Sequence, residues 1–243
     1  MELLVGCCGW DYLRGEDLGI ANWRSRYPHK LALYAAHFPV VEVNSTFYRL
    51  PRVTTAERWR ALADGVDETF EFTVKVNREV THRARFRGEK ALDAFRRTLE
   101  IATALRSRVL LLQTPPSFGP EPKNVEALRM FLEKIPRGEV QLVWEPRGNW
   151  GEELVARIVG EYSLVHCSDP FRRMPIPQGP FVYVRLHGSP PGKRMYRYTY
   201  TDSDLEWLKG RIAALRKERV YILFNNDTMY RDALRFRKLW EGK

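Results

Sequence analysis

Cysteine is scarce in this chain, and long apolar runs are absent. The 243 residues include three cysteines, an odd number that is too small for a disulfide framework and fits a reducing compartment. No apolar run approaches the roughly 20 residues that a membrane-spanning helix needs. The chain opens directly into the apolar stretch Leu3–Gly6 without a basic leader, so we expect a first strand there rather than a signal peptide. These features predict a cytoplasmic protein with no membrane partner.

Several signatures of common enzyme classes are also missing. The chain has no Walker-type phosphate loop, no glycine-rich dinucleotide fingerprint, no serine nucleophile elbow and no zinc-finger spacing. Basic residues, in contrast, outnumber acidic ones, 40 against 30, and give a formal net charge of +10. Such a charge favours an anionic small molecule or nucleic acid as partner. Cations that only solvate helix faces would give the same total.

The chain does contain a repeated pattern of short apolar run, polar cluster and amphipathic stretch. We expect eight strands, at residues 3–8, 40–44, 70–76, 109–113, 140–145, 163–167, 181–186 and 220–225. Amphipathic stretches of helix length fall at residues 30–38, 89–105, 125–135, 152–159, 202–217 and 231–240, and a further helix begins near Thr54 or Thr55. Eight strand–helix units in about 250 residues predict an α/β fold, a single (β/α)8 barrel of the TIM type over residues 1–243.

The interval after the sixth strand departs from this pattern. Pro170, Pro175, Pro177 and Pro180 crowd it. Proline removes a backbone donor and clashes inside a helix. We therefore predict that the sixth helix is short or missing.

Alternation along the strands predicts which way their polar side chains point. In the third strand, Phe72 and Val74 share one face, whereas Thr73 and Lys75 share the other. The apolar faces suit a surrounding layer of helices, so the polar faces should point into the barrel. The polar residues that would converge on its mouth are Glu42, Asn44, Lys75, Gln113, Glu145, Arg185, His187 and Asn225. Buried charges are costly unless paired, and the carboxyl end of such barrels carries the active site.

Residue chemistry suggests roles for this set. Glu42 and Glu145 could act as acid or base, since carboxylates transfer protons once their pKa values are tuned. Lys75 and Arg185 could hold negative charge, and His187 could shuttle protons near neutral pH. The alternative is a structural network of ion pairs that braces the barrel. Candidate substrate-binding residues beside the same strand ends are Trp10, Asn44, Tyr48, His82, Gln113, Arg147, Asp169, Asn225 and Asp227.

The three cysteines, Cys7, Cys8 and Cys167, all lie at predicted strand ends. Thiolates that meet at the mouth could bind a metal or an iron–sulfur cluster. Buried, inert thiols are the simpler interpretation. Carboxylates with His187 could also bind a divalent ion, but no compact ligand spacing is present, so no cofactor is clearly implied.

Three functions remain open at this point. The first is an enzyme of hydrolase or phosphodiester type that acts on a phosphate-bearing or nucleic-acid-related substrate by acid–base chemistry. The second is a non-catalytic nucleic-acid-binding protein, because loop aromatics beside arginines can stack on bases and neutralise phosphates. The same aromatics can instead line a small-molecule pocket. The third is a metal or iron–sulfur protein that uses the cysteines.

Seven motifs resemble those of one known family. They are GCCGWDY (6–12), VEVNSTFYRLP (41–51), FEFTVKV (70–76) with Thr81-His82, LLLQTPPSF (110–118), WEPRGNW (144–150), YVRLHG (183–188) and ILFNND (222–227). In this order they resemble the family called domain of unknown function 72, also named YecE-like. The resemblance implies a TIM-type barrel and supplies no reaction. The chain departs from the family at Cys7 and Cys8, where small hydroxyl residues are common, and after Asp227.

Overall fold

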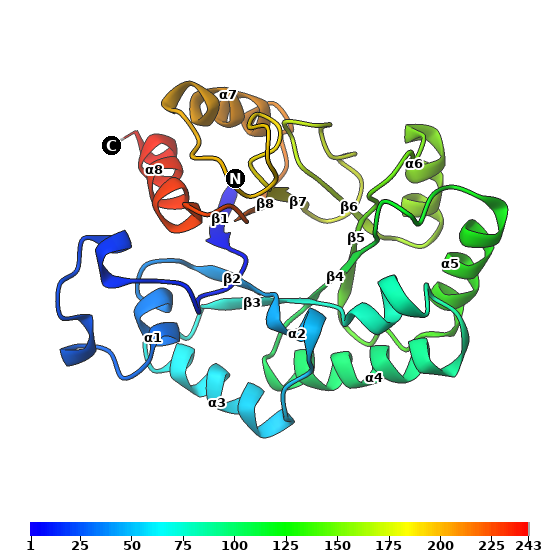
Figure 1. Cartoon of the computed structure of the whole chain (residues 1–243), viewed down its shortest axis with the longest axis horizontal. Helices are drawn as coiled ribbons and strands as arrows, with labels where there is room; N and C mark the ends of the chain where they lie inside the picture. Colours follow the sequence, from blue (N-terminus) through cyan, green and yellow to red (C-terminus); the bar gives the residue numbers. More distant parts are fainter. Residues whose placement is uncertain (243) are drawn as a thin grey trace.

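The eight predicted strands form one closed parallel barrel. The computed structural model describes residues 1–242 (Figure 1). The strands are β1 (Glu2–Cys7), β2 (Val40–Val43), β3 (Glu71–Lys75), β4 (Val109–Gln113), β5 (Gln141–Glu145), β6 (Val165–Ser168), β7 (Val182–Leu186) and β8 (Arg219–Phe224). They pair in chain order, and β8 closes on β1 from Glu2 opposite Arg219 to Cys7 opposite Phe224. The predicted TIM-type fold is confirmed.

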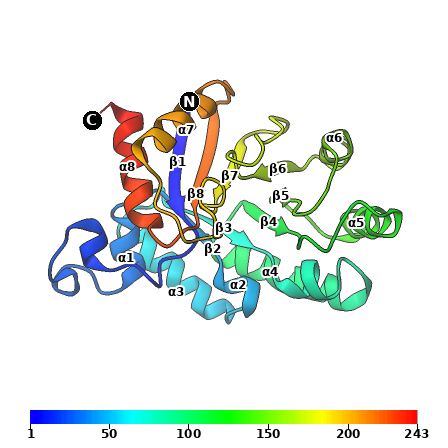
Figure 2. The same ribbon diagram turned by 45° about the horizontal axis from the view of Figure 1, so that its top comes forward.

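Helices surround the strands on the outside, as Figures 1 and 2 show. They are α1 (Lys30–Ala35), α2 (Ser45–Tyr48), α3 (Val53–Asp64), α4 (Gly88–Ala104), α5 (Pro122–Lys134), α6 (Glu152–Glu161), α7 (Asp202–Ala213) and α8 (Met229–Glu241). Short 3-10 helices at Gly15–Leu18 and Trp23–Ser25 precede α1, and a π-helical turn at Glu79–Arg83 precedes α4. No helix in residues 1–242 is both long and apolar enough to cross a membrane.

The helix that would follow β6 is missing, as the prolines predict; α6 itself precedes β6. Residues 169–181, all of them described, pass from β6 to β7 as turns and irregular chain. This loop covers the outer side of β6 in place of a helix. There the backbone N–H of Ile176 donates to His166 Nδ1 over 3.0 Å. The cover on this side of the barrel is therefore a loop that also carries polar side chains.

Side chains sort onto the two faces of the strands by their alternation. Val41 and Val43 of β2 belong to the apolar cluster between the strands and the helices. A second apolar cluster fills the inside of the barrel and includes Leu111, Val143 and Leu223. The inward polar residues share this interior, so the barrel core is part apolar and part charged.

A tyrosine hydroxyl completes the joint between β1 and β2, which pair only at Cys7 opposite Val41. Tyr34 of α1 accepts a hydrogen bond from the Cys7 backbone N–H (2.7 Å) and donates one to the Val40 carbonyl (2.8 Å). The strands come so close that a Cβ on Gly6 would lie 2.0 Å from the Val40 oxygen. Glycine at position 6 and tyrosine at position 34 therefore close the barrel together.

Replacing Tyr34 by phenylalanine should lower the free energy of unfolding by about 1–3 kcal/mol, because a buried donor and a buried acceptor lose their partner. Urea unfolding of Tyr34→Phe measures this change. Tyr12→Phe is the matched control, since that ring is 84% exposed. Equal stability of the two variants would show that the hydroxyl does not hold the joint.

Candidate active site

A buried arginine connects three strands inside the barrel. Arg185 of β7 has no exposed surface, and its Nη2 lies 2.8 Å from Glu42 Oε1 of β2. Its Nη1 lies 2.6 Å from Glu145 Oε2 of β5. Tyr183 donates to the other Glu42 oxygen (2.9 Å) and is itself 2.8 Å from Thr73. Burial lowers the pKa of Arg185, but the two carboxylates raise it further, so the net pKa lies well above its ordinary value.

Glu145 turns its second oxygen toward the mouth. Oε1 accepts from Arg147 Nε at 2.9 Å and lies 3.5 Å from His187 Nε2. Burial raises the pKa of Glu145, yet Arg185 and Arg147 outweigh it and hold this pKa well below its usual range. Glu145 is therefore ionised at neutral pH and is a weak base.

His187 is held between an acid and two cations. Its backbone N–H donates to Asp169 Oδ2 (2.9 Å), and its Nδ1 lies 3.3 Å from the same oxygen. On the other side, Nε2 lies 2.5 Å from Arg147 Nη2 and 3.3 Å from Arg185 Nη1. Because the carboxylate accepts and the guanidinium groups donate, we assign the ring proton to Nδ1 and the lone pair to Nε2. Burial lowers the pKa of His187, so the ring is neutral at neutral pH.

Lys75 ends β3 and is also buried. Its Nζ lies 4.2 Å from the centroid of the Phe47 ring, a cation–π contact. Within the described residues this ammonium makes no hydrogen bond and no ion pair. Burial, then the charge of Arg185, lowers the pKa of Lys75 to about 8. Both protonation states are populated near physiological pH, as an acid–base group requires.

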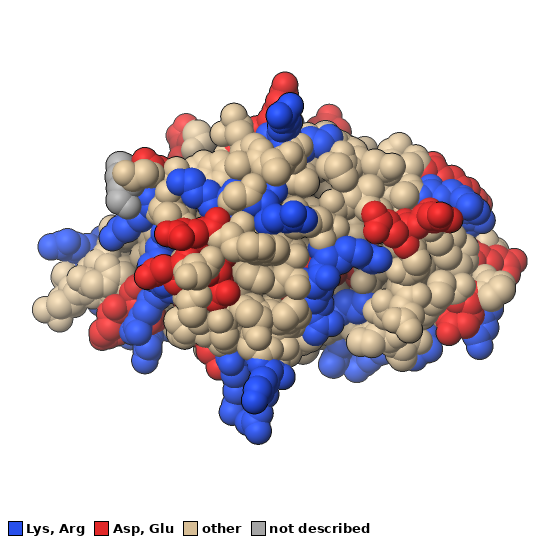
Figure 3. Space-filling model, turned by 90° about the horizontal axis from the view of Figure 1, so that it is seen from above, with Lys and Arg blue, Asp and Glu red and all other residues tan. Residues whose placement is uncertain are grey.

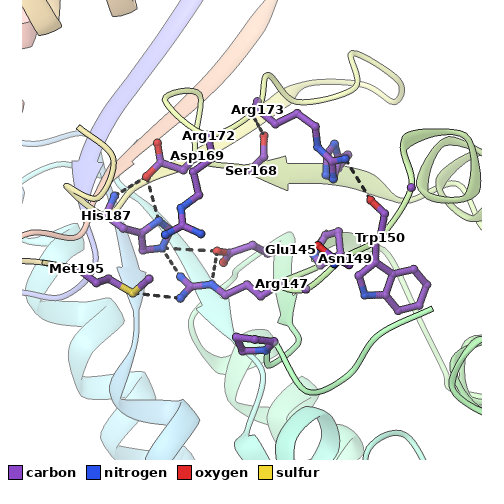
Figure 4. A pocket seen from close by; sticks show the side chains of 15 residues that line it. Glu145, Arg147, Asn149, Trp150, Ser168, Asp169, Arg172, Arg173, His187 and Met195 are labelled. Atoms are coloured by element: carbon purple, nitrogen blue, oxygen red, sulfur yellow. Dashed lines mark hydrogen bonds and ion pairs between the residues drawn. The ribbon is translucent and has the colours of Figure 1, made fainter. Parts of the chain in front are cut away.

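A cleft of about 570 Å³ opens at the outer layer of this network, and Lys75 and Arg185 are not among the residues that line it (Figure 4). Glu145, Arg147, Asp169 and His187 line the cleft. Figure 4 shows the side chains of Glu145, Arg147 and His187 pointing toward one another. The loops after β5 and β6 form its other side. Four residues predicted from strand ends are therefore brought together at one concave site.

Other predicted residues use their side chains locally. Gln113 Nε2 donates to the Thr114 carbonyl (2.8 Å), and Asn44 Nδ2 donates to the Cys8 carbonyl (3.3 Å). Trp10 is buried in the layer between strands and helices, with its ring edge-on to Trp59 at 5.1 Å. Its place in this apolar layer differs from the expected place at the mouth, because the chain turns outward after β1.

The remaining predicted residues lie around the rim. Phe47 contacts both the exposed Tyr48 and the partly buried His82, at 5.0 and 4.8 Å between ring centroids. Asn225 and Asp227 are tied by their backbone N–H groups to the carbonyls of Leu186 and Tyr196. Their side chains have no partner in the part of the chain that is described, and Asp227 is exposed. They remain candidate substrate contacts.

The three cysteines do not meet. Cys7 belongs to the outer apolar cluster, whereas Cys8 and Cys167 belong to the cluster inside the barrel. All three are buried, and burial raises the pKa of each thiol well above its ordinary value. The three-thiol site is thus not formed, and residues 1–242 hold no group of three His, Cys, Asp or Glu arranged to bind a metal ion.

The cleft also contains side chains that the strand pattern did not single out. His166, Arg172, Arg173 and Met195 line it. Their position depends on the loop that connects β6 to β7 without a helix and on the loop after β7. The cluster of prolines was the available signal that this region has an unusual shape.

Comparison with known proteins places the chain in a family. The family described as "Protein of unknown function DUF72" matches residues 4–242. The chain belongs to this family. The description of DUF72 assigns no reaction, so the chemistry has to be argued from the cleft.

Relatives of this DUF72 chain share most of its length. UPF0759 protein YunF of Bacillus subtilis (strain 168) is 27% identical over 266 residues, which cover 93% of this chain and 89% of YunF. A DUF72 protein of Thermotoga maritima MSB8 has a solved structure with TM-score 0.72 and 23% identity, over 99% of this chain and 100% of that one. The solved structure of a DUF72 protein of Enterococcus faecalis V583 has a TM-score of 0.74 and 19% sequence identity, and the match covers 98% of this chain and 95% of that one. At these identities the two structures show the shared barrel fold.

Removing the central cation should unfold the barrel readily. Arg185→Leu leaves Glu42 and Glu145 buried without their partner, so we expect the free energy of unfolding to fall by about 3–5 kcal/mol. Urea denaturation measures it, and Arg157→Leu on the exposed side of α6 is the control. A loss no larger than that of the control would mean that the carboxylates are not dependent on Arg185.

Proposed function

We propose that this protein is an enzyme that acts on an anionic substrate by acid–base chemistry in the cleft at the barrel mouth. One observation carries the proposal: Asp169 and His187 form a buried pair, and the unprotonated Nε2 of His187 lies beside Glu145 and Arg147 in that cleft. Such an acid–histidine pair is the arrangement in which an imidazole acts as a general base.

His187 is the base in this mechanism. Its Nε2 is unprotonated at neutral pH, since burial lowers the pKa of the ring. When Nε2 takes a proton, Asp169 stabilises the imidazolium through Nδ1. The base is therefore unprotonated before substrate arrives, and its imidazolium is stabilised after it has acted.

Arg147 is the group that meets the negative charge of the substrate or of the transition state. Its side chain is 18% exposed, and it spans Glu145 Oε1 and His187 Nε2. A substrate oxygen can take the place of His187 as acceptor for the Arg147 Nη2 donor, and this exchange frees the imidazole lone pair. Charge-assisted hydrogen bonds of this kind are among the stronger ones.

Lys75 is the acid. A pKa of about 8 leaves it mostly protonated at neutral pH and able to release a proton. Hydrolysis fits this pair of groups: His187 takes a proton from water, the resulting hydroxide attacks the electrophilic centre, and Lys75 protonates the leaving group. Glu42 and Glu145, which the sequence suggested as acid or base, serve here as the charges that hold Arg185 and Arg147.

The nucleic-acid-binding alternative gains less support. Trp10 and Trp150 are each 3% exposed, so neither indole offers a face for a base to stack on. Figure 3 shows basic and acidic side chains interspersed over the face that it presents. A continuous basic, aromatic rim of the kind that tracks a nucleic-acid backbone is not visible on that face.

The base can be tested by turnover of a panel of phosphorylated metabolites. His187→Gln should lower kcat on the order of 100-fold or more, because general-base catalysis is lost. Asp169→Asn should lower kcat as well, since the supporting carboxylate is removed, while Asp93→Asn on the exposed side of α4 should leave it unchanged. Full activity of His187→Gln on every metabolite turned over by the wild type would refute the assigned base.

The pH dependence of kcat/KM gives a second test. Activity should fall as pH rises through about 8, because Lys75 then loses the proton that it donates. It should also fall at acidic pH, below the ordinary pKa of histidine, as the His187 lone pair is taken by a proton at its lowered pKa. Lys75→Arg should remove the basic limb, because arginine does not titrate in this range. A basic limb that is identical in the variant would exclude Lys75 as its origin.

A further inference from the structure

The outer end of the cleft, beside Trp150, carries a cation without an acidic partner in the described residues, Arg173. We propose that Arg173 and His166 form a subsite for a phosphate group beside Trp150, and that this phosphate is the handle of the substrate rather than its reacting group. The second half of this statement rests on the proposed function, because it places the reacting group at His187. The subsite itself is supported by the burial and hydrogen bonds of His166 and by the unpaired charge of Arg173.

His166 contributes a buried donor that lacks an acceptor. Its Nδ1 accepts from the Ile176 backbone N–H (3.0 Å), so the ring proton lies on Nε2. The residue is 1% exposed, and Nε2 has no hydrogen-bond partner among residues 1–242. Burial, followed by the charge of Arg173, lowers the pKa of His166 to about 4, so the ring is a neutral donor. A buried N–H without a partner costs free energy, and a ligand oxygen in the cleft would satisfy it.

The two arginines hold only backbone carbonyls. Arg172 Nε donates to the Ser189 carbonyl (3.0 Å), and Arg173 Nη1 donates to the Trp150 carbonyl (3.2 Å), a contact seen in Figure 4. Neither makes an ion pair with a carboxylate in the described part of the chain. Each guanidinium is thus anchored by one bond and keeps further donors for an anion, which arginine binds well.

The end of α6 lies at the same part of the cleft. Trp150 and Gly151 line it, and Gly151, as the N-cap, has no side chain to accept from the first helical N–H groups. Those groups favour an anion. Glu152 and Glu153 in the first turn oppose one, so the subsite depends on Arg173 and His166 more than on the helix.

The distribution of charge along the cleft separates the two ends. At the inner end, the cations Arg147 and Arg185 are both paired with Glu145, and Asp169 adds a further negative charge. At the outer end, Arg173 is unpaired, and its guanidinium points away from His187 toward Trp150 (Figure 4). Arg172, which also has no carboxylate partner among the described residues, lies nearer the inner end, where its Nε donates to the carbonyl of Ser189. A phosphate bound by Arg173 therefore leaves a different part of the substrate, such as a carbonyl or ester, at His187. A cleft of about 570 Å³ suits a small phosphorylated metabolite.

Inorganic phosphate is the probe for the subsite. Calorimetric titration of the full-length protein, against chloride at equal ionic strength, should show saturable one-to-one binding. Arg173→Gln should weaken it by at least about tenfold, the loss of one charge-assisted contact. His166→Phe should weaken it as well. Arg157→Gln, an equal change of charge on the exposed side of α6, should leave the affinity as it is.

Two outcomes would overturn the subsite: no saturable binding by the wild type, or an equal effect of Arg157→Gln and Arg173→Gln, the sign of general electrostatics. Turnover separates this proposal from the proposed function. Loss of phosphate binding in Arg173→Gln with full activity in His187→Gln would sink the function and keep the subsite. Loss of activity in His187→Gln, with unchanged phosphate affinity and KM in Arg173→Gln, would do the reverse.

Discussion

The charge of Arg185 at the centre of the barrel constrains everything around it. A guanidinium with no exposed surface is stable only where carboxylates replace its water, and Glu42 and Glu145 do so from two other strands. Because one Glu145 oxygen is committed to Arg185, the other is turned toward the mouth. There it fixes Arg147, and through Arg147 it sets the orientation of the His187 ring. The reactive surface is thus the outer layer of a network whose inner layer holds the barrel together.

This network also controls the state of the titratable groups. Burial is the main cause that lowers the pKa of His187, Glu145 and Asp169 act to raise it, and the permanently charged Arg185 and Arg147 lower it again, so the net pKa lies below the ordinary value. Lys75 experiences the same environment, and the charge of Arg185 helps to lower its pKa. A base and an acid with pKa values on either side of neutrality follow from one buried cation and the low polarity of the surrounding barrel.

Strand alternation explains which residues could be predicted from the sequence. Glu145 and His187 follow regular strands, so their inward direction is determined by counting residues from apolar neighbours. The same rule separates Cys7 from Cys8, since consecutive residues of a strand face opposite sides of the sheet. The hypothesis that both thiols meet at the mouth did not take this alternation into account. Trp10 lies beyond the end of β1, after a glycine at φ 117°, where alternation no longer applies. His166 faces outward on β6, and its contact with Ile176 forms only once the following loop has folded back.

The absence of a helix between β6 and β7 connects these points. A helix there would cover the outer side of β6 with apolar side chains and bond its own backbone groups internally. The proline-rich loop leaves backbone N–H groups free, and the Ile176 N–H uses this freedom to fix the tautomer of His166. The same loop begins with a turn in which the N–H groups of Arg172 and Arg173 both donate to the Asp169 carbonyl. Asp169, the partner of His187, is therefore also the residue from which the two arginines are positioned, so the inner and outer ends of the cleft share one structural origin.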